Sequence, residues 1–178
     1  MRDDMQEILF SEAQLHERVS EMGKALSDEY RGKEPIFVGV LKGSFIFMAD
    51  LLRCVDIPCS VDFMCVSSYG NKSYTTGAVQ IRKDLSEDIE NRHVVIVEDI
   101  LDSGVTLSYL VKYLQGRNPA SISIVTLLDK PSRRQKHVDT KMVGFEIPDA
   151  FVVGYGLDFA EKYRNLPYIG VLKPEVYS

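Results

Sequence analysis

The sequence has no tryptophan, few cysteines and no long apolar run. Its three cysteines, Cys54, Cys59 and Cys65, are odd in number, and their spacing matches neither a C-x-x-C redox pair nor a set of zinc ligands. We therefore expect no disulfide framework and no zinc site, and we interpret all three as buried apolar residues.

No apolar stretch approaches the ~20 residues that a membrane-spanning helix needs. The N-terminal sequence MRDDMQEILF is acidic, and it has no apolar core long enough for a signal peptide. These absences predict a cytoplasmic protein without a membrane partner.

Positive charge is also scarce, because 21 lysines and arginines face 26 aspartates and glutamates, which gives a formal net charge of −5. Binding a long nucleic-acid backbone calls for clustered excess lysine and arginine, so we expect no nucleic-acid partner. The chain has 178 residues, and a soft prior of roughly 150 residues per domain predicts a single domain, residues 1–178.

The first predicted helix begins at a capping box formed by Ser11 and Gln14, and Gly32 is a plausible stop. Apolar residues at helical spacing define its buried face: Leu15, Val19, Met22 and Leu26.

Short apolar strands then alternate with helices, a pattern that predicts an α/β fold with a Rossmann-like, mostly parallel sheet flanked by helices. Helices are expected at residues 44–54, with Phe45, Met48, Leu51 and Leu52 inward, and at residues 105–115. Strands are expected at residues 35–41, 58–66, 93–98, 121–128, 150–155 and 168–172, with an extended segment at 78–83. Ligands of such sheets bind beyond the carboxyl ends of the strands, so the polar residues after Leu41, Val97, Leu128 and Val153 should meet at one rim.

The densest chemical signal is VVIVEDILDSGVTL at residues 94–107, in which a strand ends in two carboxylates and a short turn opens a helix. Gly104 lets the backbone approach a ligand, Ser103 and Thr106 offer hydroxyl groups, and the free N–H groups of a helix start favour an anion. The pattern predicts a phosphate cradle. No Walker A motif occurs, and Gly154-Tyr155-Gly156 does not complete a dinucleotide fingerprint.

Acids beside a phosphate cradle indicate a sugar phosphate that carries a divalent cation. The simpler reading is that Glu98 and Asp99 end a strand and Asp102 caps the helix. Three acids together with the Ser-Gly-Val-Thr turn favour the functional reading.

At this point the stretch resembles the phosphoribosyl pyrophosphate signature of the type I phosphoribosyltransferases, in particular their hypoxanthine-guanine members. The resemblance covers essentially the whole chain, because further motifs match in order: Leu41-Lys42-Gly43-Ser44, Ser68-Tyr69, Lys130-Pro131, and Phe151-Val152-Val153-Gly154-Tyr155 with Asp158 and Arg164.

The resemblance implies that a phosphoribosyl group passes from phosphoribosyl pyrophosphate to N9 of hypoxanthine or guanine, which gives IMP or GMP and pyrophosphate. It implies Mg²⁺ as cofactor, a homodimer or homotetramer, a small hood, and a flexible lid loop containing Ser68 and Tyr69. Ser68 and Tyr69 belong to a polar loop, Ser67 to Gly77.

It also implies roles for individual residues. Asp102 would be the general base on N7 of the purine. The ribose and 5′-phosphate would be bound by Glu98, Asp99, Asp102, Ser103, Gly104, Val105 and Thr106, where Val105 replaces a lysine of some relatives. Magnesium would be held by Glu98, Asp99 and Asp158. Pyrophosphate would be bound by Lys42, Gly43 and Arg164, with a Leu41–Lys42 peptide that is often cis in such enzymes. The purine would be bound by Lys130, Phe151, Val152 and Asp158.

Two alternatives stay open. A pyrimidine-specific relative would share the phosphate cradle, although Lys130 and Phe151-Val152 fit a purine better. A nucleotide-sensing, RNA-binding regulator on the same fold should show an extended basic face. The only basic cluster is short, and beyond Lys130 we interpret its members, Arg133, Arg134 and Lys136, as a solvated loop.

Overall fold

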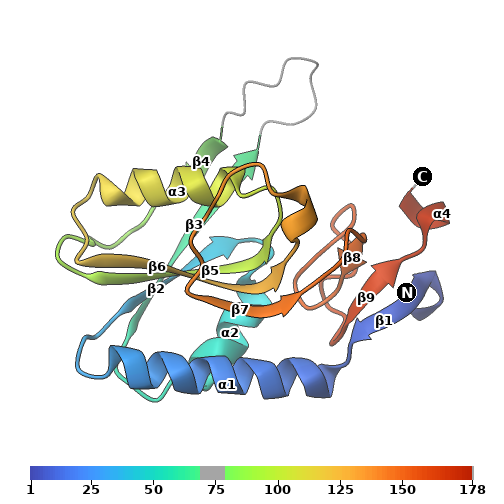
Figure 1. The fold of residues 1–178 in the computed structure, drawn as a ribbon, viewed down its shortest axis with the longest axis horizontal. Helices are drawn as coiled ribbons and strands as arrows, with labels where there is room; N and C mark the ends of the chain where they lie inside the picture. The colour runs from blue at the N-terminus through green and yellow to red at the C-terminus, as the bar shows by residue number, and fades with distance from the viewer. Residues whose placement is uncertain (69–78, 178) are drawn as a thin grey trace.

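A six-stranded sheet forms the centre of the computed structural model, which describes residues 1–68 and 79–177 (Figure 1). In spatial order its strands are β4 (Val79–Lys83), β3 (Ser60–Ser68), β2 (Ile36–Leu41), β5 (His93–Leu101), β6 (Ser121–Asp129) and β7 (Met142–Glu146). All neighbours pair in parallel except β3 and β4, which form an antiparallel edge. The predicted α/β class and the mostly parallel sheet are confirmed.

Helices cover both faces of this sheet. Figure 1 shows α1 (Glu12–Tyr30) and α2 (Phe45–Arg53) below it and α3 (Val105–Gln115) above it. Side chains of β5 alternate between the two layers, with Val95 packed among α1 and α2 and Ile96 packed against α3. Burial on both faces explains why the central strand reads as a continuous apolar run.

The start of α1 confirms the predicted capping box. The Ser11 side chain accepts a hydrogen bond from the Gln14 N–H, and the Gln14 side chain accepts one from the Ser11 N–H. The predicted apolar face is also buried, so the helix is fixed by its cap at one end and by the core along its length.

A second, smaller sheet lies beside the first and has the antiparallel order β1 (Met5–Phe10), β9 (Ile169–Leu172), β8 (Val152–Val153). Together with α4 (Pro174–Tyr177) we call it the hood. The prediction that residues 150–155 and 168–172 complete the parallel sheet is wrong. A parallel return needs a covering crossover, usually a helix, whereas the chain between β8 and β9 forms turns, with Gly154 and Gly156 at positive φ.

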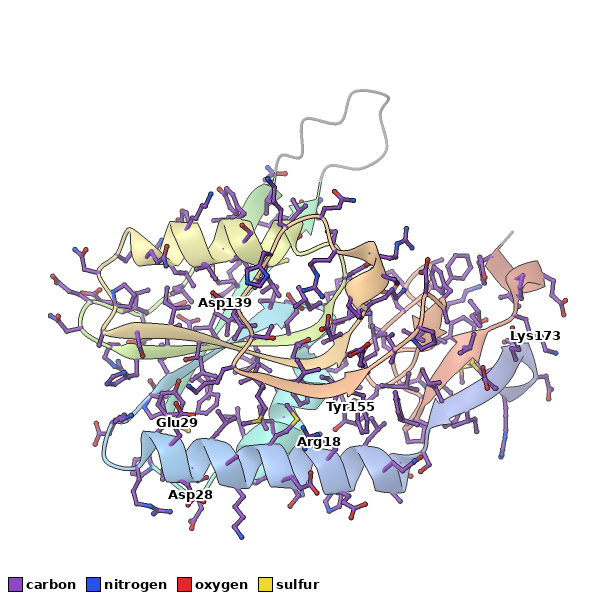
Figure 2. The ribbon with its side chains drawn as sticks, viewed as in Figure 1. Arg18, Asp28, Glu29, Asp139, Tyr155 and Lys173 are labelled. Carbon is purple, nitrogen blue, oxygen red and sulfur yellow. The ribbon has the colours of Figure 1, made fainter. Side chains whose placement is uncertain are left out.

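The hood is joined to the main layers by Tyr155, whose hydroxyl donates to Asp50 Oδ2 of α2 at 2.6 Å. Tyr155 lies between the hood and the helices in Figure 2. Short 3₁₀ helices at Arg2–Asp4 and Pro131–Arg133 complete the described elements. Within residues 1–68 and 79–177, no helix is long and apolar enough to cross a bilayer.

Two predictions about side chains are wrong. Cys54 and Cys65 are half-buried and Cys59 is exposed, because Cys54 caps the end of α2 and Cys59 lies in the link to β3. Phe45 is also exposed, because it is the first residue of α2, and Phe47 fills the core in its place.

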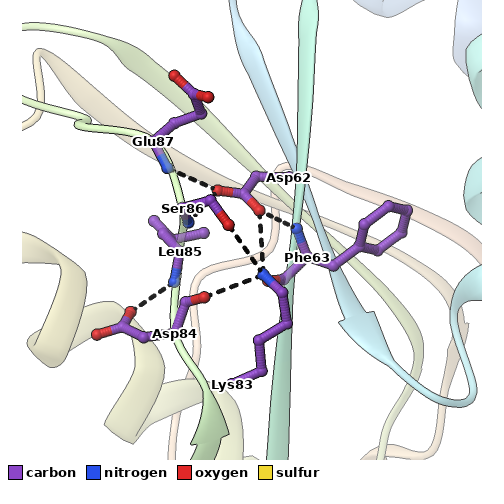
Figure 3. Close-up of polar contacts among 7 residues, drawn as sticks. All are labelled: Asp62, Phe63, Lys83, Asp84, Leu85, Ser86 and Glu87. Carbon is purple, nitrogen blue, oxygen red and sulfur yellow. Dashed lines mark hydrogen bonds and ion pairs between the residues drawn. The ribbon is translucent and has the colours of Figure 1, made fainter.

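The Asp62 side chain of β3 accepts hydrogen bonds from the segment that follows β4 (Figure 3). Its Oδ2 accepts hydrogen bonds from the backbone N–H groups of Ser86 at 2.6 Å and Glu87 at 3.0 Å. Its Oδ1 accepts from the Phe63 N–H at 2.7 Å and from Lys83 Nζ at 3.3 Å. Burial acts to raise the pKa of Asp62, but these donors outweigh it, and the pKa lies below its ordinary value.

We expect Asp62→Asn to lower the free energy of unfolding by about 2–3 kcal/mol at neutral pH, because hydrogen bonds to a charged group contribute ~1.5–3 kcal/mol. A carboxyl with a lowered folded pKa stabilises the protein above its unfolded pKa of about 3.9, and this contribution disappears as pH falls through the folded pKa. Urea unfolding should therefore show a constant difference from the wild type above about pH 5 and a shrinking one below about pH 4.

The matched control is Asp28→Asn, because the Asp28 carboxylate is 66% exposed and pairs with Arg31 just past the end of α1. It should change stability by less than about 0.5 kcal/mol. Equal effects of the two substitutions would contradict a stabilising role for the Asp62 network.

Candidate active site

The carboxyl ends of β2 and β5 open onto a cavity of about 440 Å³. The predicted rim is therefore confirmed in part, because residues after Leu41 and Val97 meet there, whereas those directly after Leu128 and Val153 are not in the cavity lining. The cavity brings together predicted site residues from three separate stretches of the chain: Gly43, Glu98, Asp99, Asp102, Ser103, Gly104, Thr106, Asp158 and Arg164.

Strand β5 continues through the two adjacent acids to Leu101, rather than ending at them as predicted. Burial raises the pKa of Glu98 well above its ordinary value, and the neighbouring Asp99 charge raises it further. Burial also raises the pKa of Asp99, against the hydrogen bonds that its side chain accepts, including one from the Ile100 N–H at 2.8 Å. Neither carboxylate forms an ion pair within the described residues.

This pair of carboxylates fits a magnesium ion that arrives with a phosphate-bearing ligand. Mg²⁺ prefers oxygen ligands and is usually held by one or two carboxylates plus substrate phosphates. Within residues 1–68 and 79–177 no group of three or more His, Cys, Asp or Glu side chains could hold an ion by itself. The predicted ligands Glu98, Asp99 and Asp158 all line the cavity, but they do not form a preassembled three-residue cluster.

Asp158 has other partners. One carboxylate oxygen lies 2.8 Å from the Arg164 guanidinium, and the other accepts a hydrogen bond from the Glu161 N–H at 2.8 Å. The Arg164 guanidinium also donates to the Gly156 carbonyl at 2.7 Å, while its Nε is buried with no hydrogen-bond partner in the described chain. Asp158 therefore orients Arg164, which keeps an unused donor beside the cavity.

Residues 102–106, the phosphate turn, lead from β5 into α3. Gly104 is the N-cap residue with φ +79°, and a Cβ there would overlap the Lys136 carbonyl oxygen. Ser103 Oγ accepts a hydrogen bond from the Val105 N–H at 3.3 Å. The first N–H groups of a helix lack carbonyl partners inside the helix, so this turn has the composition of an anion site.

Asp102 carries the clearest sign of an unused acceptor. Its Oδ1 is buried and has no hydrogen-bond partner among the described residues. The nearest cation is Arg133, whose Nε lies 3.9 Å away. A buried carboxylate oxygen without a donor has an unmet hydrogen-bonding requirement, which a protonated ligand atom could fill.

The loop after β2 lies against the two acids. The Leu41–Lys42 peptide is cis, as the resemblance implied. A Cβ at Gly43 would overlap the Asp99 carboxylate, and a Cβ at Gly156 would overlap the Gly43 carbonyl. The loop after β2, strand β5 and the turn at Gly156 thus pack too closely for a Cβ at either contact. This close packing explains glycine at both positions.

Lys42 does not line the cavity. Its Nζ pairs with Glu161 Oε2 at 2.9 Å, and both side chains are largely exposed. An exposed ion pair of this kind is worth little, so Lys42 is readily released to another anion.

Of the predicted purine residues, Asp158 lines the cavity, whereas Lys130, Phe151 and Val152 do not. Lys130 is buried, and its Nζ donates to the Ala150 carbonyl at 2.8 Å and lies 3.7 Å from Asp149 Oδ1. Phe151 is 38% exposed and stacks on Tyr177, with ring centroids 4.8 Å apart. Val152 is buried in β8.

Several of these neighbours could not be predicted from the sequence. Tyr177 and Asp149 belong to no motif, and the short basic cluster predicted a solvated charge at Arg133. Val105 opens α3 outside the cavity lining. Of the predicted lid residues, Ser68 ends β3 and Tyr69 lies outside the described residues.

A second cavity of about 660 Å³ lies between α3 and residues 137–139. None of the predicted site residues is in its lining, in which His137 and Asp139 pair with each other at 2.8 Å and Lys112 is a further charged residue. The chemistry of the molecule is concentrated at the smaller cavity.

Comparison with known proteins gives matches over the whole chain. The profile of the phosphoribosyl transferase domain matches residues 6–160. The hypoxanthine-guanine phosphoribosyltransferase of Bacillus subtilis (strain 168) is 55% identical over 178 residues, which are 100% of this chain and 99% of that protein. The bifunctional protein TilS/HprT of Listeria monocytogenes serotype 4b is 54% identical over 178 residues, which are 28% of its length. A crystal structure of a hypoxanthine phosphoribosyltransferase from Staphylococcus aureus, 53% identical, matches with a TM-score of 0.96 over 100% of this chain and 97% of that one.

Proposed function

Because this chain belongs to the phosphoribosyl transferase domain family, we infer that it is an enzyme of purine salvage, which transfers a 5-phosphoribosyl group from phosphoribosyl pyrophosphate to N9 of hypoxanthine or guanine. The products are IMP or GMP and pyrophosphate. The structural observation that carries this function is the meeting of the phosphate turn, two buried acids, Gly43 and Arg164 around one cavity.

The chain's own residues support each part of the transfer. The reaction breaks the bond from ribose C1 to pyrophosphate and forms one from C1 to purine N9, so positive charge develops on the sugar and negative charge on the leaving group. Arg164 and Lys42 bind and stabilise the departing pyrophosphate. Asp102, with its unpartnered oxygen, accepts the proton that leaves N7 of the purine.

Magnesium, when bound, neutralises charge on pyrophosphate and helps to orient the ribose hydroxyls. We propose that Glu98 and Asp99 hold it, and that Asp158 acts instead through its contacts with Arg164. Lys130 and Phe151 hold the purine, with the backbone of Val152 beside its edge.

The deciding experiment is a pyrophosphate-release assay with phosphoribosyl pyrophosphate, Mg²⁺ and one base at a time. Release with hypoxanthine and guanine, and none with uracil, supports the proposal. Release with uracil alone would favour the pyrimidine-specific alternative. Salt-dependent RNA binding without pyrophosphate release would favour the regulator.

Lys130 is expected to set the preference for 6-oxopurines, because its ammonium group complements a carbonyl and opposes the 6-amino group of adenine. Lys130→Met should lower kcat/KM for hypoxanthine by about 10–100-fold, since a hydrogen bond to a charged group contributes ~1.5–3 kcal/mol. The measurement is the ratio of kcat/KM for hypoxanthine and adenine. Lys24→Met, an exposed change on α1, should leave that ratio unchanged, and equal use of adenine by the wild type would refute the assignment.

We also propose that the chain forms a homodimer or homotetramer in the cytoplasm. Light scattering coupled to size exclusion measures the assembly directly. A mass near 20.1 kDa would identify a monomer and contradict the proposal.

A further inference from the structure

Residues 130–136 pack against the phosphate turn and contain an arginine, Arg134, that is not in the cavity lining. Arg134 Nε donates to the Asp102 carbonyl at 3.0 Å, and its NH2 donates to the Leu101 carbonyl at 3.3 Å. The same guanidinium forms an ion pair with Asp129 at the end of β6. With its side chain only 20% exposed, Arg134 is not the solvated charge that its basic surroundings predicted.

Backbone groups of the same segment bind the adjoining carbonyls. The N–H groups of Gln135 and Lys136 both donate to the Ser103 carbonyl, at 2.9 and 3.0 Å, and the Lys130 N–H donates to the Leu101 carbonyl at 3.0 Å. Three successive carbonyls, those of Leu101 at the end of β5 and of residues 102 and 103 in the turn, therefore accept hydrogen bonds from this one segment. Gly104 adds a close backbone contact with Lys136 on that side.

Hydrogen bonds to these carbonyls also determine the direction of the N–H group in each peptide. In a trans peptide the C=O and N–H bonds point in opposite directions, so a carbonyl held from behind directs the next residue's N–H forward. Holding the carbonyls of residues 101–103 sets the direction of the N–H groups of residues 102–104. Those residues line the cavity, at the helix start where an anion binds best.

We propose that Arg134 is a positioning residue for the 5′-phosphate site: it binds the rear carbonyls of the phosphate turn so that the turn's N–H groups face the phosphate. The inference rests on the proposed function, because that function puts a phosphate at this turn. Arg134 would act through the backbone carbonyls that it binds, without placing its own charge at the ligand.

The test compares Arg134 with an arginine that makes the same kind of contact elsewhere. Arg18 of α1 (Figure 2) donates to the carbonyls of Val143 and Gly144 on β7, at 2.8 and 3.0 Å. Both Arg134→Gln and Arg18→Gln remove two hydrogen bonds to carbonyls, but only the first disturbs the turn. Arg134→Lys keeps the charge beside Asp129 and loses the two-pronged donor, so it decides the question if Arg134→Gln does not fold.

Steady-state kinetics should show KM for phosphoribosyl pyrophosphate raised about tenfold in the Arg134 variants, with KM for hypoxanthine unchanged, since loss of a charged hydrogen bond has effects of this size. Calorimetry with ribose 5-phosphate should show affinity weakened by a similar factor. Arg18→Gln should alter neither quantity, even where it lowers the melting temperature.

Unchanged KM and unchanged ribose 5-phosphate affinity in Arg134→Lys would overturn the proposal, as would an equal rise of KM for both substrates. A wild type that releases no pyrophosphate would instead refute the proposed function. The ribose 5-phosphate measurement needs no turnover and still decides the role of Arg134.

Discussion

Asp102→Asn is expected to lower turnover by about 10²–10⁴-fold, the usual contribution of a positioned general base, while substrate binding is retained. Asparagine has nearly the same shape, but its amide cannot accept the purine proton. The unpartnered, buried Oδ1 of Asp102 and the 3.9 Å distance to Arg133 leave this oxygen open to a ligand. Steady-state kinetics give the turnover, and calorimetry with GMP gives the binding.

The control is Asp139→Asn, whose carboxylate is 97% exposed and pairs with His137. This change should leave turnover and GMP affinity unaltered. Near-normal turnover in Asp102→Asn would exclude Asp102 as the base. A loss of GMP binding as large as the loss of turnover would assign it to binding instead.

The second large effect is expected from Gly43→Ala, because the added Cβ would overlap the Asp99 carboxylate. Either that carboxylate or the loop after β2 must move, and both belong to the proposed pyrophosphate and magnesium site. Misplacement of about 1 Å can cost about 10²-fold in rate. We expect kcat/KM for phosphoribosyl pyrophosphate to fall by about that factor, with an increased magnesium requirement.

Gly116→Ala is the matched control. Gly116 has φ −63° at the end of α3, and its added Cβ would approach only the Tyr113 carbonyl at 3.4 Å. An alanine that fits its backbone stabilises a protein by about 0.4–1 kcal/mol, so this variant should keep full activity and melt slightly higher. Full activity in Gly43→Ala would contradict the prediction, because it would show that the loop after β2 can move away from Asp99 without loss of function.

The sequence predicted best where the signal is local. Helix α3 occupies the predicted residues 105–115, because its apolar spacing and the glycine before it lie within one short stretch. The capping box of α1 is likewise a pattern of four residues. The phosphate turn and its acids belong to one continuous motif, so their common place at the cavity followed from the order of strand, turn and helix.

Predictions failed where distant segments decide the outcome. Strand pairing in the hood joins β1 to β9 across most of the chain, and no spacing within either segment indicates it. The ion pair between Asp158 and Arg164 was missed for a similar reason, since the two residues were assigned separately to magnesium and to pyrophosphate. Arg134 looked solvated because a sequence does not show which backbone carbonyls a side chain will meet.

The hood has a practical consequence for anyone who attaches a tag or a second domain. Both described chain ends lie in it (Figure 1), with Met5 starting β1 and Tyr177 ending α4. The Tyr177 ring packs on Phe151, the proposed purine platform, whereas the phosphate turn follows β5 of the other sheet. A bulky C-terminal fusion should therefore change the relative kcat/KM values for different purine bases. It should leave KM for phosphoribosyl pyrophosphate unchanged.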